Sequence, residues 1–148
     1  METPNFKVRA IGEIAIRCID HGAMVAFYRD VIGLSLMNDP KESPIVFFRV
    51  ADGFEGHTAV LALFRHDVEG AGGVNGSPQP PGTGSASSLH HLALSLAWDD
   101  QDAVMDWYDR LGLAYDIEYF DWVGWRGIFT RDPDGNTVEL VAKDPDYR

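Results

Sequence analysis

Two stretches of the chain alternate apolar and polar residues with a period of two. Residues 13–18 read EIAIRC, and residues 88–96 read SLHHLALSL. Because successive side chains of a β-strand point to opposite faces, each stretch predicts a strand with one apolar face. We expect that apolar face to pack against a helix in both cases.

An amphipathic helix is predicted after each of these strands. Apolar residues recur at helical spacing in both segments, at Met24, Phe27, Tyr28 and Val31 in the first and at Val104, Trp107, Tyr108 and Leu111 in the second. The expected N-caps are Asp20 and either Asp99 or Asp100, and the expected terminating glycines are Gly33 and Gly112. The chain therefore contains an internal repeat.

Three more strands are predicted after each helix. They cover residues 34–37, 45–50 and 58–64 in the first copy and residues 113–120, 125–130 and 137–141 in the second. The fold class is thus α+β, built from two βαβββ modules at residues 1–66 and 88–148. Residues 67–87 are rich in Gly, Pro and Ser and predict a flexible linker between the modules.

The charge and the cysteine content narrow the functional classes. The formal net charge is −11, which disfavours nucleic acids and anionic membranes as partners. Cys18 is the single cysteine, and no apolar run approaches the roughly 20 residues that span a bilayer. We expect a cytoplasmic protein that binds a small molecule.

Three ionisable residues share the strand faces that the helices leave uncovered. Alternation places Glu13, His91 and Glu139 on these faces, and it turns His90 toward the helix side or the end of its strand. A buried carboxylate needs a cation, donors or a metal ion. The alternative is a hydrogen-bonded core histidine, with the two glutamates paired to Arg17, Arg126 or Arg131.

Three motifs within the repeat, HLALSL, AFYRDVIGL and DPDGNTVEL, resemble the vicinal oxygen chelate superfamily. This superfamily includes glyoxalase I, extradiol dioxygenases, fosfomycin-resistance proteins, methylmalonyl-CoA epimerase and the bleomycin-resistance proteins. The resemblance implies that the modules curl into a mixed β-sheet cup with the helices outside, and that homodimers form. It also implies that Glu13, His91 and Glu139 are metal ligands, whereas Ala62 stands where glyoxalase I has a carboxylate ligand.

The resemblance implies one divalent ion, Mn²⁺, Fe²⁺, Zn²⁺ or Mg²⁺, and a small oxygenated substrate, with aromatic compounds among the options. The reaction would be of dioxygenase or of lyase/isomerase type, with Glu139 and Tyr119 as the catalytic candidates. The candidates for substrate binding are Trp122, Trp125, Arg126 and Phe64. The alternative function is a metal-free binding protein of the bleomycin-resistance type.

Overall fold

The computed structural model describes residues 1–74 and 76–148, and it divides the chain into two compact units. The first unit is Met1–Pro81 and the second is Gly82–Arg148. Part of the predicted linker packs on the first unit, because Ala71 is buried and its carbonyl accepts a hydrogen bond from Arg17 Nε. Residue 75 of the predicted linker lies outside the described residues, and the role of residues 67–87 as a linker stays a prediction.

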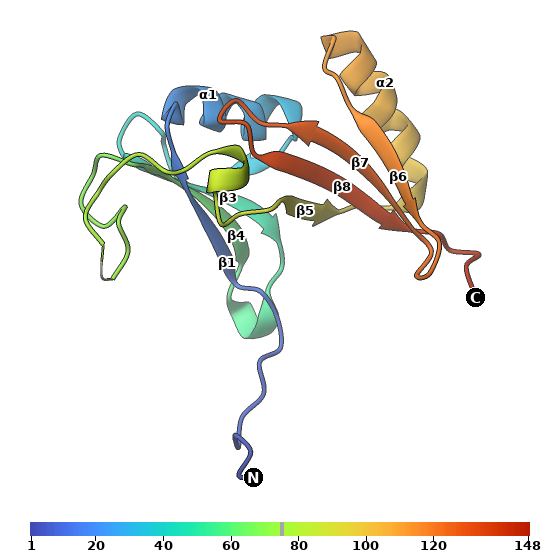
Figure 1. Cartoon of the computed structure of the whole chain (residues 1–148), viewed down its shortest axis with the longest axis horizontal. Coiled ribbons are helices and arrows are strands. Elements are labelled where there is room, and N and C mark those ends of the chain that lie inside the picture. Colours follow the sequence, from blue (N-terminus) through green and yellow to red (C-terminus); the bar gives the residue numbers. More distant parts are fainter. Residues whose placement is uncertain (75) are drawn as a thin grey trace. The chain divides into compact units, whose positions relative to one another are not determined.

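The first unit has the order βαβββ and one four-stranded sheet (Figure 1). Its elements are β1 (Glu13–Cys18), α1 (His21–Ala26), the π-helical turn η1 (Phe27–Val31), β2 (Ser35–Leu36), β3 (Ile45–Ala51), the 3₁₀ turn η2 (Phe54–Gly56) and β4 (Ala59–Arg65). The strand order is β1-β4-β3-β2. β1 runs parallel to β4, and the other pairings are antiparallel.

The second unit repeats this plan. Its elements are the 3₁₀ turn η3 (Gly84–Ala86), β5 (Leu92–Ser95), the 3₁₀ turn η4 (Trp98–Asp100), α2 (Gln101–Leu111), β6 (Asp116–Phe120), β7 (Trp125–Arg131) and β8 (Thr137–Lys143). The strand order β5-β8-β7-β6 matches that of the first unit, again with the first and last strands parallel. The predicted α+β class with two βαβββ modules is confirmed.

The helices begin and end largely where their capping residues predict. The side chain of Asp20 accepts a hydrogen bond from the backbone N–H of Ala23 at the start of α1 (3.0 Å). Gly112 ends α2 in the left-handed conformation, with φ +66°. The predicted first helix is not uniform, because its second half is the π-helical turn η1.

The core of the first unit follows the predicted alternation in β1, whereas the helix of the second unit departs from its predicted apolar stripe. Ile16 and Cys18 of β1 are buried, whereas Arg17 is exposed. In α2, Tyr108 is buried, but Trp107 and Leu111 are exposed. Gln101 is fully buried at the start of α2, and its Nε2 donates hydrogen bonds to the carbonyls of Arg126 and Leu140. A polar residue therefore makes part of the helix–sheet contact that the sequence predicted to be apolar.

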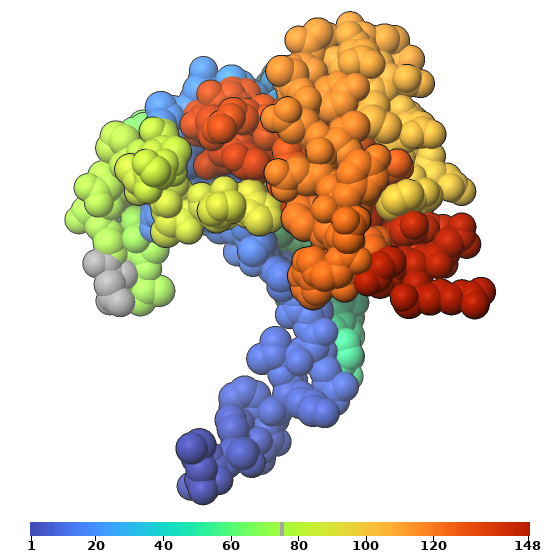
Figure 2. Space-filling view, turned by 45° about the vertical axis from the view of Figure 1, so that its right-hand side comes forward, coloured from blue at the N-terminus to red at the C-terminus, as the bar shows by residue number. Residues whose placement is uncertain are grey.

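Residues 1–11 precede β1 as an exposed extension of the first unit (Figure 2). Three apolar side chains of this extension, Phe6, Val8 and Ile11, are exposed. Among the described helices, none combines the length and the apolar character needed to cross a bilayer.

Candidate functional site

A histidine and a buried glutamate meet on one face of the second sheet. His91 Nε2 lies 3.2 Å from Glu139 Oε2. Glu139 is only 5% exposed, whereas the His91 side chain is 37% exposed. The pair therefore joins a carboxylate that is largely shielded from water to an imidazole that is still accessible.

The strand pairing explains why these two residues meet. β5 runs parallel to β8, with Ala93 paired to Glu139, and His91 precedes Ala93 by two residues. Alternation puts His91 and Glu139 on the same side of this strand pair. The pairing of β5 with β8, which follows the DPDGN turn (residues 132–136), thus brings the side chains of His91 and Glu139 next to each other.

His90 lies before the ladder of β5, at the end of its strand, which is one of the two placements that the sequence left open. Its Nδ1 lies 2.8 Å from Nδ1 of His91, so the two rings touch instead of pointing to opposite faces. The ladder of β5 begins only at Leu92, and residues before it are not held to strand alternation. Glu139, His91 and His90 consequently form a hydrogen-bonded row in which one of the two Nδ1 atoms donates and the other accepts.

Gly127 makes room for the glutamate. Phe129 of β7 pairs with Glu139, and Gly127 lies two residues earlier on the same face. A Cβ atom at position 127 would lie 2.4 Å from Glu139 Oε1 and 2.6 Å from Phe129 Cε2. A glycine is therefore required for the carboxylate to occupy its observed place.

The surroundings of Glu139 raise the pKa of its carboxyl above the ordinary value. Burial raises the pKa of Glu139, and the nearby carboxylate of Glu118 raises it further, whereas His91 lowers it. Glu118 lies on β6 opposite Gly127, which places it on the same face as Glu139. A cation beside Glu139 would offset the cost of burying the charged carboxylate.

Three residues of this face, Glu118, Gly127 and Phe129, were missed from the sequence. Strand alternation places them on the same face as Glu139 once the pairing of β6, β7 and β8 is known. That pairing depends on the register between strands, which the local pattern of each strand does not contain.

Arg126 and Tyr119 lie on the opposite face of the second sheet. They pair with each other across β6 and β7, one position out of phase with Gly127. The guanidinium of Arg126 lies 4.1 Å from the centre of the Trp98 ring, and Arg126 Nε donates to Gln101 Oε1. The structure does not bring either residue to Glu139.

The two predicted tryptophans lie close together near the β6–β7 turn. The rings of Trp122 and Trp125 are 6.5 Å apart, and both are exposed. Trp125 shares the parity of Gly127 on β7 and so lies on the face of Glu139. The remaining aromatic candidate for substrate binding, Phe64, is in the first unit.

The remaining predicted residues lie on one face of the sheet of the first unit, at different points along its strands. Glu13 is exposed at the start of β1, and Phe64 of β4 is half-buried on the same face. Ala62, two residues before Phe64, is fully buried. Because Glu13 belongs to the first unit, its approach to His91 and Glu139 stays a prediction.

The donor set of the pair suits a divalent cation. Two donors that each lie about 2.1 Å from one ion are about 3 Å apart when they hold neighbouring positions around it, which is close to the observed separation. An imidazole and a carboxylate are ordinary ligands of Mn²⁺, Fe²⁺ and Zn²⁺. Within residues 1–74 and 76–148, no three His, Cys, Asp or Glu side chains gather closely enough to form a complete metal site.

Paired βαβββ units with a parallel first and last strand define the vicinal oxygen chelate class of proteins. The chain belongs to the Glyoxalase/Bleomycin resistance protein/Dioxygenase superfamily, whose family model matches residues 10–140. It is 27% identical over 142 residues to the uncharacterized protein YaeR of Escherichia coli (strain K12), an alignment that covers 92% of this chain and 98% of YaeR.

Two solved structures are similar over nearly the whole chain. Lactoylglutathione lyase from Agrobacterium tumefaciens is 25% identical, with a TM-score of 0.62 and coverage of 92% of this chain and 95% of the other. A glyoxalase/dioxygenase from Nostoc punctiforme is 18% identical, with a TM-score of 0.68 and coverage of 97% of both chains. The second likeness concerns the fold alone.

Proposed function

We propose that this protein is a divalent-metal-dependent enzyme of the vicinal oxygen chelate type that acts on a small oxygenated substrate. Glu13, His91 and Glu139 are the proposed metal ligands, and the reaction is of dioxygenase or of lyase/isomerase type. The name of the similar lactoylglutathione lyase supports the second of these types.

One observation supports this proposal most strongly. An imidazole nitrogen and a buried carboxylate oxygen lie 3.2 Å apart at a place where Gly127 leaves room for the carboxylate. A buried carboxylate costs several kcal/mol unless it is paired, so Glu139 needs a cationic partner. A partly exposed histidine is a weak partner at neutral pH, since it is charged only when protonated.

A bound divalent ion would supply an electrophile that stabilises negative charge on a substrate oxygen. Glu139 would hold the ion from the protected side of the face, and His91 would hold it through Nε2. That role needs a proton on Nδ1 of His91, which would then donate to Nδ1 of His90. His90 would thereby fix the orientation and the tautomer of the ligating ring.

The aromatic side chains would position the substrate. Phe129 lies beside His91, with ring centres 6.2 Å apart, and Phe120 lies 6.4 Å from Phe129. These rings form an apolar border to the His91–Glu139 pair, and Trp125 lies on the same sheet face. Such a border favours a substrate that has an apolar or aromatic part next to its oxygen atoms.

Metal content and affinity test the proposal. The protein is purified without chelators, analysed for metals, and titrated with Mn²⁺, Zn²⁺, Mg²⁺ and Fe²⁺ after treatment with EDTA. We expect about one tightly bound ion per chain and a loss of affinity of more than about 100-fold in His91→Ala and Glu139→Gln. A wild-type protein that binds none of the four ions at neutral pH would contradict the proposal.

Glu118→Gln is the matched control. Glu118 is an exposed glutamate on the same face, so its replacement changes the local charge equally without removing a proposed ligand. We expect its effect on affinity to stay below about 10-fold. Circular dichroism of each variant separates the loss of a ligand from unfolding.

The exposed pair Trp122 and Trp125 favours one other function, the binding of a flat or cationic ligand without a metal. The same EDTA treatment separates the two. Ligand affinity that survives chelation, with no effect of Glu139→Gln, would favour the binding protein.

Homodimerisation is the remaining part of the proposal. The exposed side chains of Phe6, Val8 and Ile11 are consistent with a partner surface in residues 1–11. Light scattering at micromolar concentration is expected to give the mass of two chains, and a monomer would contradict it.

A further inference from the structure

The second unit contains a polar pocket that the metal proposal does not use. The segment before β5 and the β7–β8 hairpin enclose about 560 Å³. The polar side chains that line it include Ser85, Ser87, Ser88, His90, Arg131 and Thr137. No aspartate or glutamate is among its lining residues, although the chain as a whole carries a net charge of −11.

Arg131 brings a positive charge without a matching carboxylate. Within the part of the chain that the structure describes, Arg131 forms no ion pair, and its Nη1 donates to the carbonyl of Gly135 at 3.4 Å, which is a weak contact. The corresponding residue of the first unit is Arg49, which is paired with Asp52. The difference leaves most of the guanidinium donors of Arg131 available to a ligand.

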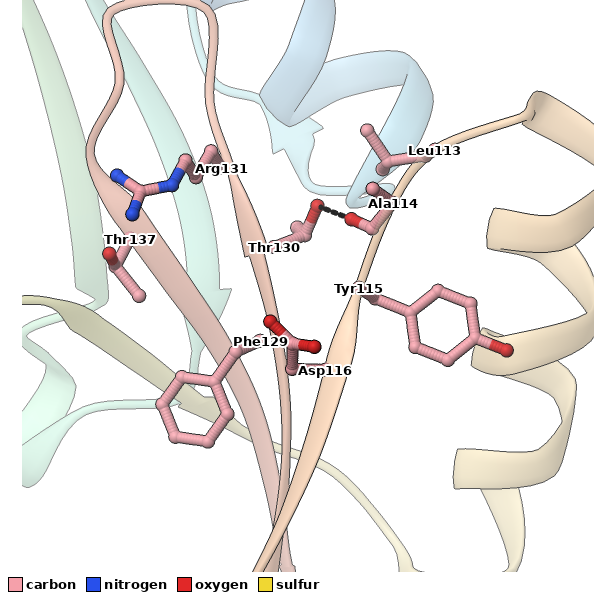
Figure 3. A pocket seen from close by; sticks show the side chains of 8 residues that line it. All are labelled: Leu113, Ala114, Tyr115, Asp116, Phe129, Thr130, Arg131 and Thr137. Atoms are coloured by element: carbon pink, nitrogen blue, oxygen red, sulfur yellow. Dashed lines mark hydrogen bonds between the residues drawn. The ribbon is translucent and has the colours of Figure 1, made fainter.

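Asp132 and Asp116 lie near the pocket but do not line it. Both oxygens of Asp132 accept hydrogen bonds within the hairpin, from the backbone of Asp134 and from Asn136. Asp116 lines a neighbouring cavity of about 320 Å³, drawn in Figure 3, which shares Arg131 and Thr137 with the pocket. In that view the guanidinium of Arg131 extends toward Thr137, which is its partner across the two strands.

We propose that this pocket binds an oxyanion, the phosphate or carboxylate group of a small ligand. Arg131 supplies a planar cation with several N–H donors, and the hydroxyls of the three serines and of Thr137 supply neutral donors. A pocket with an arginine, several hydroxyl donors and no carboxylate in its lining favours an anion over a cation. The site is separate from the ligand set of the proposed enzyme.

The pocket adjoins that ligand set, which gives the substrate class a specific form. Thr137 precedes Glu139 by two residues on the same face of β8, or about 7 Å along the strand. His90 lines the pocket and contacts His91. If the proposed metal function holds, the substrate has an anionic group at one end and oxygen donors for the metal at the other.

The anion site is tested on the metal-free full-length chain. Inorganic phosphate and acetate are titrated separately at constant ionic strength, with chloride as the balancing ion, and the ¹H–¹⁵N NMR signals are followed. We expect saturable shifts confined to residues 84–90 and 131–137. The anion that binds more tightly identifies the group, phosphate or carboxylate.

Variants of Arg131 assign the binding to this pocket. Arg131→Gln is expected to weaken binding by about 10-fold or more, whereas Arg131→Lys keeps a positive charge and weakens it less. Arg49→Gln is the matched control, because it removes the equivalent arginine of the first unit, and it should leave the affinity unchanged. Shifts that do not saturate with either anion, or equal affinity in Arg131→Gln, would overturn the proposal.

The outcome for the metal function is read separately. Glu139→Gln should abolish metal binding yet retain the anion affinity, since Glu139 does not line the pocket. Anion binding without any metal binding would sustain the pocket and reject the enzyme. Metal binding without anion binding would support the proposed enzyme and reject the anion site.

Discussion

The two units carry different residues at matching points of the same strand pairing. In the first, β1 pairs Ala15 with Ala62, and Glu13 precedes Ala15 by two residues. In the second, Ala93 pairs with Glu139, and His91 precedes Ala93 by two residues. Each unit thus has an ionisable residue two positions before the matching alanine of its first strand, but only the second also has a carboxylate at the paired position of its last strand.

The space around these positions differs in the same sense. Phe47 pairs with Ala62 just as Phe129 pairs with Glu139, yet the glycine at 127 corresponds to Ile45 in the first unit. The first unit therefore has an isoleucine side chain at the strand position where the second unit has none. The duplicated scaffold therefore determines where a donor pair can form, and the size of one neighbouring residue determines whether it does.

The largest effect is expected when the missing carboxylate is placed in the first unit. Ala62→Glu would bury a charge at a fully buried position beside Ile45, and we expect a loss of about 3–5 kcal/mol in the free energy of unfolding. Urea denaturation at neutral pH measures it. Ala15→Glu, at the exposed position paired with Ala62, is the control and should cost less than about 1 kcal/mol. A stable Ala62→Glu protein would show that both units have room for the donor.

The contribution of the first unit is measured by Glu13→Gln. Because Glu13 is exposed, the folding stability should change by less than about 0.5 kcal/mol, whereas the affinity for the divalent ion should fall by about 10–100-fold. Calorimetric titration compares it with the wild type. Unchanged affinity would confine the site to the His91–Glu139 pair.

Gly127→Ala removes the spatial difference between the units. The added Cβ would lie 2.4 Å from Glu139 Oε1, so the carboxylate must move. We expect a loss of about 1–3 kcal/mol in stability and a decrease of about 10-fold in metal affinity. Gly22→Ala is the control, since its nearest atom, Asp20 Oδ1, is 3.9 Å away, and it should be neutral or slightly stabilising. If both variants behave alike, the close approach at Gly127 has no role.

The smallest effect concerns the helix of the second unit. Burial raises the pKa of Tyr108 to about 12, and among the described residues its hydroxyl has no hydrogen-bond partner. The folded state therefore keeps its proton where the unfolded state, with a pKa of about 10, has lost it, and stability falls as the pH rises from about 10 to 12. Tyr108→Phe should change stability by at most about 1 kcal/mol at pH 7 and reduce this alkaline loss. An unchanged alkaline slope would mean that another group titrates.

Much of the candidate site could be predicted from local alternation. The period of two predicted that Glu13 and His91 lie on the faces away from the helices. It also predicted that Glu139 lies on the same face of its sheet as His91. It could not place His90, because the ladder of β5 begins after both histidines. Alternation alone also did not show that Arg126 and Tyr119 lie on the opposite face from Glu139. Their face depends on the register between β6 and β7, which nearness in sequence does not reveal.

The sequence by itself determined the two βαβββ modules, because strand and helix periods, aspartate caps and glycine turns are local properties of the chain. Only the tertiary structure decided that Glu139 is buried beside His91, that Gly127 makes this possible, and that Arg131 lacks the carboxylate that Arg49 has. These features depend on which residues of separate strands become neighbours. A carboxylate acquires its burial, its partners and its pKa from that neighbourhood, and so does the chemistry that it supports.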